Sequence, residues 1–133
     1  MTEKASGTFD ITAWDEYATD ERPGGLSLGR VRVSKTFHGD LTGTSETELQ
    51  TVVTSAGPAA YVGVELFEGT LHGRKGTFVL QHGAGGDETG GPWLRWEIVP
   101  SSGTGELTGL RGQGNIVVAE DGSHSYTLDH ELS

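Results

Sequence analysis

Apolar and β-branched residues alternate with polar ones in short runs along the whole chain, and turn-forming residues separate the runs. Such a period of two is typical of β-strands, whose successive side chains point to opposite faces of a sheet. We expect eight strands, at residues 5–13, 26–38, 40–54, 59–72, 75–83, 92–100, 112–119 and 124–132. The stretches between them contain the Gly, Pro, Asp and Ser residues that tight turns need.

An even number of sequential antiparallel strands can close on itself, which leaves no exposed sheet edge. The pattern therefore predicts an all-β fold: a single closed antiparallel eight-stranded barrel of lipocalin size over residues 1–133. About eight strands leave an interior that side chains just fill or that holds one small ligand.

One segment also fits a helix. "SETELQTVV" (45–53) begins with the Ser-x-x-Glu of a capping box, and Leu49, Val52 and Val53 follow at helical spacing. The threonines in and around it favour a strand, because β-branched side chains lose rotamer freedom in helices. We expect a strand here and keep a short helix as the alternative.

Composition narrows the classes of partner. A net charge of −10 argues against nucleic acid and against an anionic membrane surface as binding partners, since both attract clustered Lys and Arg.

The chain contains no cysteine, which excludes disulfides and a cysteine nucleophile and suits a reducing compartment. "MTEKASGTFD" lacks the apolar run of a signal peptide, and no stretch approaches the roughly 20 apolar residues that span a bilayer. We expect a soluble cytoplasmic protein.

The strand "YVGVELFEG" (61–69) carries a glutamate on each face, and Glu65 shares its face with Tyr61 and Phe67. If "SAGP" (55–58) is a four-residue turn, Glu48 lies opposite Glu65. If Gly73 and Arg74 close the next hairpin, Glu65 also lies opposite His82. Directly opposed residues have Cβ atoms about 4.5–5.5 Å apart, so the three side chains would form one row across three strands.

Such a row suggests catalysis. Two carboxylates in a partly dry cavity do not both ionise easily, so the pKa of one rises and that group can deliver a proton near neutral pH. We therefore expect Glu65 to act as general acid or base, coupled to Glu48 and His82. The predicted ligand-binding wall consists of apolar side chains on the same face and one tryptophan: Tyr61, Phe67, Phe78, Leu80 and Trp96.

The opposite face is at least as apolar, with Leu49, Val62, Val64 and Leu66 among its members. A register slip of one residue exchanges the two faces. Either face can therefore be the interior, and the row of Glu48, Glu65 and His82 can instead face water.

The remaining histidines give no sign of a metal site. They fall at turns or strand ends without the convergent spacing of zinc ligands: His38, His72, His124 and His130. We expect neither a metal nor another cofactor.

Several stretches resemble the bacterial family called domain of unknown function 3224. They are "TFHGDLTGTS" (36–45), "EGTLHGRKGTFVLQH" (68–82), "GTGELTGLRGQG" (103–114) and "YTLDHEL" (126–132), and the resemblance runs from "GTFDITAWDE" (7–16) nearly to the end. It implies a small closed barrel similar to allene oxide cyclase, and "GTGELTGLRG" is also similar to a stretch of dirigent proteins. Those proteins hold a reactive apolar molecule inside the barrel while a ring closes, but none of their catalytic residues has a counterpart here.

Together these observations predict a barrel that binds an apolar or polyketide-like small molecule and promotes its cyclisation or isomerisation. The alternative is a non-catalytic binding or structural barrel whose interior is filled by its own side chains. We also expect a homo-oligomer, a dimer or a trimer, because a small barrel without a covering helix has to hide outer apolar residues.

Overall fold

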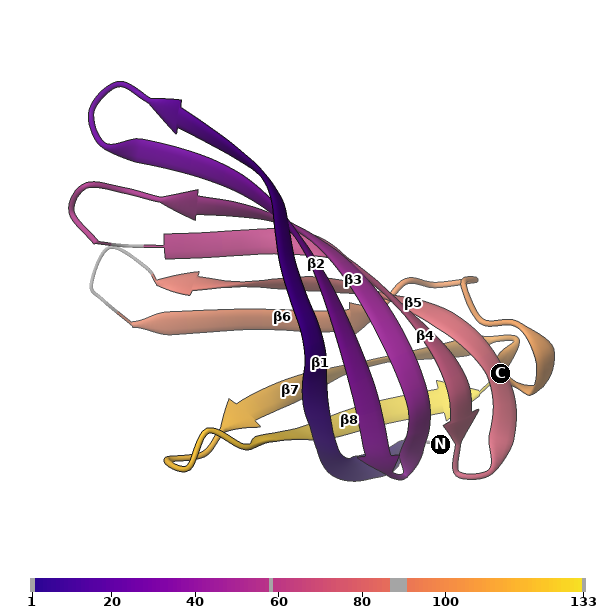
Figure 1. Cartoon of the computed structure of the whole chain (residues 1–133). Coiled ribbons are helices and arrows are strands. Elements are labelled where there is room, and N and C mark those ends of the chain that lie inside the picture. The colour runs from indigo at the N-terminus through magenta and orange to yellow at the C-terminus, as the bar shows by residue number, and fades with distance from the viewer. Residues whose placement is uncertain (1, 58, 87–90, 133) are drawn as a thin grey trace.

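The computed structural model describes residues 2–57, 59–86 and 91–132, and within them eight strands form one closed antiparallel barrel (Figure 1). Each strand pairs with the next along the chain, and the last strand pairs with the first. The strands are β1 (Glu3–Arg22), β2 (Leu26–Gly39), β3 (Leu41–Val53), β4 (Ala59–Leu71), β5 (Arg74–Gly86), β6 (Pro92–Ile98), β7 (Leu110–Val118) and β8 (His124–Leu132). The predicted fold class is confirmed, and residues 45–53 belong to a strand.

β1 is about twice as long as predicted. Beyond residue 13 it continues to Arg22, pairs with the first half of β2, and is interrupted by register shifts between Ile11 and Ala13 and between Glu16 and Ala18. Nearly every side chain in this part is exposed. Because neither face is buried, residues 14–22 lack the apolar alternation by which the other strands could be found. In Figure 1 the turn between β1 and β2 lies far from the C-terminus.

Apolar side chains fill one half of the barrel. Phe37, Phe67, Phe78 and Trp96 are almost completely buried there, and they form a single packed cluster with leucines of β3, β4, β5, β7 and β8. A short 3-10 turn, η1 (Gly105–Leu107), lies between β6 and β7, and its buried Leu107 joins this cluster. The segment around η1 therefore packs against the filled half of the barrel.

Glycines permit a close approach of the backbone at this filled end. Gly43, Gly69 and Gly76 are register partners across β3, β4 and β5. A Cβ on Gly69 would lie 2.2 Å from the carbonyl oxygen of Thr42, and the φ of 157° at Gly69 suits glycine alone. β3 and β4 approach each other this closely because no side chain stands between Gly43 and Gly69, whereas a Cβ on Gly76 would lie 2.1 Å from the carbonyl oxygen of Thr104.

Pairing is weakest between β6 and β7. In the described residues Glu97 and Gln113 are the one pair in register there, whereas β7 and β8 pair over nine residues.

The described part of the chain contains no helix with the length and apolar character that a bilayer crossing requires.

Candidate functional site

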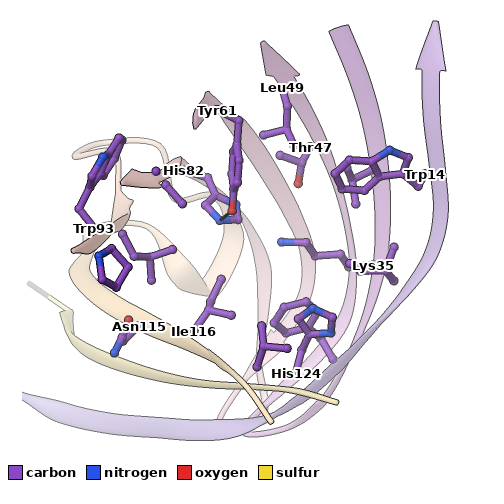
Figure 2. Close-up of a pocket in the computed structure, with 18 residues that line it drawn as sticks. Trp14, Lys35, Thr47, Leu49, Tyr61, His82, Trp93, Asn115, Ile116 and His124 are labelled. Carbon is purple, nitrogen blue, oxygen red and sulfur yellow. Dashed lines mark hydrogen bonds between the residues drawn. The ribbon is translucent and has the colours of Figure 1, made fainter. Parts of the chain in front are cut away.

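The other half of the barrel encloses a cavity of about 610 Å³ (Figure 2). All eight strands contribute to its wall, which is mostly apolar. The wall includes Phe9, Ile11, Trp14, Val33, Lys35, Thr47, Leu49, Tyr61, His82, Ala84, Gly85, Pro92, Trp93, Leu94, Asn115, Ile116, Val118 and His124. A cavity of this size and composition suits one small organic molecule, since ligand pockets commonly measure about 300–1,000 Å³.

Glu65 lies where the cavity meets the filled half. It is completely buried, and its Oε1 accepts hydrogen bonds from Lys35 Nζ at 3.2 Å and from Trp96 Nε1 at 3.1 Å. Its Oε2 accepts a hydrogen bond of 2.6 Å from the Ser45 hydroxyl. Lys35 lines the cavity and Trp96 belongs to the filled cluster, so this one carboxylate joins both halves of the interior.

Glu65 is ionised at neutral pH. Burial alone would raise the pKa of its carboxyl group, but the adjacent His82 imidazole, the Lys35 charge and the Ser45 hydroxyl together outweigh burial and lower the pKa to about 2. The sequence-based expectation of a raised pKa is therefore wrong. A carboxylate with so low a pKa, already surrounded by donors, is a poor general acid or base at neutral pH.

His82 and Tyr61 form a polar pair beside Glu65. The Nδ1 atom of His82 lies 3.3 Å from Glu65 Oε1, and its Nε2 lies 3.3 Å from the Tyr61 hydroxyl. The two rings meet edge to face, with centroids 5.4 Å apart. Burial, and next the Glu65 charge, raise the pKa of Tyr61, so its hydroxyl keeps its proton.

Lys35 brings a positive charge to the cavity. Its side chain is 4% exposed, and its Nζ lies between Glu65 and the Phe9 ring, 4.7 Å from the ring centroid. Figure 2 shows the amine reaching towards the middle of the cavity. Among the cavity-lining residues that the structure describes, Lys35 is the only lysine or arginine.

Thr47 carries an unpaired polar atom beside this group. Its side chain is 1% exposed, and Oγ1 has no hydrogen-bond partner in the described part of the chain. An unpaired buried hydroxyl reduces stability. The cavity wall therefore contains a polar group that the fold itself does not use.

Glu48 does not join the site, which corrects the predicted row. β3 and β4 pair Thr47 with Glu65 and Val53 with Ala59, so the connection between them is one residue longer than expected. Glu48 therefore points outwards, where it accepts hydrogen bonds of 2.8 Å from both the Tyr17 hydroxyl and Arg32 Nε. These two bonds lower its pKa.

His82 keeps its predicted place through a different register. The turn between β4 and β5 consists of His72 and Gly73, so Glu65 lies opposite Leu80, and His82 lies opposite Gly63. The register differs from the predicted one by two residues, which leaves His82 on the same face as Glu65. The face of β4 that carries Tyr61, Glu65 and Phe67 is the interior, and the question left open by the sequence is answered.

The predicted ligand wall is divided between the two halves. Tyr61 lines the cavity. Phe67, Phe78 and Leu80 face the interior but belong to the packed cluster of the filled half and do not line the cavity. Trp96 is also inside, beneath Glu65 rather than in the cavity wall.

Sequence reasoning missed Lys35, Thr47 and the aromatic rim formed by Trp14 and Trp93. Lys35 had a signal that could have been found, because it alternates in phase with Val31, Val33 and Phe37 along one strand. A lysine within an inward-facing apolar series indicates a buried charge with a partner.

The fold and the cavity define a class of protein: a small closed β-barrel with one end filled and the other hollow. The chain belongs to the family described as protein of unknown function (DUF3224), whose model matches residues 5–130. A solved structure from Shewanella oneidensis MR-1, described as a protein with unknown function from the DUF3224 family, is 37% identical in sequence. The match covers 100% of this chain and 99% of that chain, with a TM-score of 0.89. The comparison with curated proteins finds no match.

Proposed function

We propose that the barrel binds an apolar small molecule that carries one anionic or strongly accepting oxygen group, such as a carboxylate or a polarised carbonyl. The observation that carries this proposal is Lys35, a buried ammonium group in an otherwise apolar wall. The apolar body of such a ligand would lie against Trp14, Trp93 and Ile116. Its oxygen would accept a hydrogen bond from Lys35.

Glu65 has a positioning role in this proposal. Its carboxylate holds the Lys35 amine at 3.2 Å and so keeps the positive charge in the cavity. Without that partner, the charge of Lys35 would be unpaired in the interior, which is strongly destabilising. The Tyr61 hydroxyl offers a second polar contact in the same cavity.

A second candidate function is cofactor-independent isomerisation or cyclisation of an enolisable carbonyl compound. The observation that favours it is the pair formed by the Tyr61 hydroxyl and His82 Nε2, which can pass a proton at the cavity wall. In this scheme Lys35 would stabilise the developing enolate oxygen, and the shaped cavity would orient the reacting atoms. The resemblance to allene oxide cyclase barrels supports the same candidate at the level of fold alone.

Binding is tested with a fluorescent conjugated-polyene fatty acid and its uncharged methyl ester, followed by energy transfer from the tryptophans of the cavity rim. We expect saturable binding of the acid at one molecule per chain, and weaker binding of the ester. A hydrogen bond to a charged group contributes about 1.5–3 kcal/mol, so the preference should be about 10-fold to 100-fold.

The informative variant replaces both buried charges, Lys35→Met together with Glu65→Gln, because removing only one would leave the other unpaired in the interior. This double variant should bind acid and ester equally. Lys75→Met, which removes an exposed lysine outside the cavity wall, is the matched control and should bind like the wild type. Absence of saturable binding to the wild type, or an undiminished preference for the acid in the double variant, would overturn the proposal.

Turnover is tested separately with Tyr61→Phe. If the second candidate is right, this variant binds an identified enolisable substrate as the wild type does but converts it at least 10-fold more slowly. Equal turnover by the two proteins would exclude a proton-transfer role for Tyr61.

A further inference from the structure

A second group of potential ligands lies at the filled end of the barrel, near both ends of the chain (Figure 1). Glu3, His72 and His130 each present one ligand atom there, and the three atoms lie within 4.8 Å of one another. The residues come from the start of β1, the turn between β4 and β5, and the end of β8. This group shares no residue with the cavity described above.

Barrel closure brings the first two residues together. Glu3 and His130 are register partners in the pairing of β1 with β8. Directly opposed residues of an antiparallel pair have Cβ atoms about 4.5–5.5 Å apart. No spacing along the sequence could reveal this proximity, because 126 residues separate the two positions, and for this reason the histidines were expected to lack convergence.

The third residue is held by a network of backbone contacts. His72 N–H donates a hydrogen bond of 2.9 Å to the carbonyl oxygen of Asp40. Asp40 in turn accepts a hydrogen bond of 2.9 Å from the Ser6 N–H through its Oδ2. The turn that carries His72 is thereby attached to β1, the strand that carries Glu3.

One feature of these histidines has no explanation in the fold. His130 is 4% exposed, yet its Nε2 lacks a hydrogen-bond partner among the described residues. Buried polar groups without a partner are rare and call for a functional explanation. The φ of +48° at His72, by contrast, is what the first central position of a two-residue hairpin turn requires.

We propose that Glu3, His72 and His130 bind a divalent transition-metal ion, with Zn²⁺ as the best match. Two imidazoles and one carboxylate are ligands that zinc prefers, and three protein ligands leave a fourth position for water. Ligand atoms at about 2.0–2.1 Å from a tetrahedral zinc lie about 3.4 Å apart. Small rotations of the exposed Glu3 and His72 side chains would bring the three atoms to that spacing.

The surroundings support a cation. The three residues line a hollow of about 230 Å³ that also contains Glu131 and Arg74. Asp40 Oδ1 lies 3.8 Å from His72 Nδ1, on the side where an outer carboxylate commonly orients a metal-binding imidazole.

The test uses the untagged full-length chain after treatment with a chelator. Titration with ZnCl₂ in a calorimeter should show one saturable site per chain, and Co²⁺ should give the absorption spectrum of a tetrahedral complex. His72→Asn removes one ligand while placing at φ +48° a residue that tolerates this conformation, so the fold should be kept. Glu3→Gln removes the exposed carboxylate ligand without changing its shape.

Each of these two variants should lose more than about 100-fold in zinc affinity, since removing merely an outer-shell partner costs about 10-fold to 100-fold. His38→Asn, an exposed histidine outside the group, is the control and should bind zinc like the wild type. Absence of saturable binding to the wild type would overturn the proposal. So would wild-type affinity in both ligand variants, or an equal loss in His38→Asn, because the zinc would then be held by other surface histidines.

Discussion

Replacing Glu65 with glutamine tests the electrostatic description of the barrel interior. The carboxyl group has a pKa of about 2 in the folded protein, against an ordinary value of 4.5. A difference of one unit in the pKa of a group between the folded and unfolded states corresponds to about 1.36 kcal/mol. The ionised carboxylate therefore contributes about 3 kcal/mol to the free energy of unfolding at pH 7, a value in keeping with the cost of breaking a buried ion pair.

The sign of the pH dependence follows from the direction of the shift. Because folding lowers the pKa of Glu65, its contribution is complete above pH 4.5 and disappears as the pH falls towards 2. At pH 3 about 1 kcal/mol remains. Glu65→Gln should thus lower the free energy of unfolding by about 3 kcal/mol at pH 7 and by only about 1 kcal/mol at pH 3.

The assay is urea unfolding of the wild type and the variant at both pH values, with linear extrapolation to water. Comparing the two proteins at each pH cancels the titration of the other acidic groups. Glu68→Gln, an exposed residue on the outer face of the same strand, is the control and should change stability by less than about 0.5 kcal/mol. A Glu65→Gln effect that is equal at both pH values, or that grows as the pH falls, would refute the lowered pKa.

Three further predictions concern other parts of the barrel. Thr47→Val removes the unpaired buried hydroxyl and should raise the free energy of unfolding by about 1 kcal/mol, seen as a higher melting temperature in calorimetry; a lower one would reveal an unseen partner for Oγ1. Leu107→Ala should cost about 2–5 kcal/mol in urea unfolding if η1 packs against the filled half, and a loss below about 1 kcal/mol would contradict that role. The homo-oligomer expected from the sequence stays a prediction, and the exposed row of Val62, Val64 and Leu66 on β4 is where we test it. Val64→Lys should reduce the mass measured by light scattering to that of a monomer, whereas a monomeric wild type would remove the prediction.

The fold could be predicted because the residues that point to one face of a strand recur at every second position. β4 shows Tyr61, Glu65 and Phe67 on one face and Val62, Val64 and Leu66 on the other, so its strand character was clear. Which face was the interior could not be read, since both are apolar. That choice depends on how eight strands meet, which no single strand encodes.

The prediction of the site depended on the predicted positions of the turns, because the turns set which residues of neighbouring strands face each other. A one-residue error at the connection between β3 and β4 moved Glu48 to the outer surface. At the next turn, an error of one residue in its position changed the register by two residues, and this left His82 on its predicted face, because a shift by two keeps a side chain on its face. The division of the interior into a filled and a hollow half could not be predicted, as it depends on the width of the closed barrel rather than on residue type.

The separation of these two halves has an evolutionary consequence. Packing around Phe37, Phe67 and Phe78 holds the barrel together, while most of the cavity wall lies outside that cluster. Substitutions at the rim, such as Trp14 or Trp93, can therefore alter the shape and polarity of the cavity at little cost to folding. In a lineage built on this barrel, the cavity can therefore vary while the fold is inherited unchanged, and this variation ends at Glu65, which is hydrogen-bonded to residues of both halves.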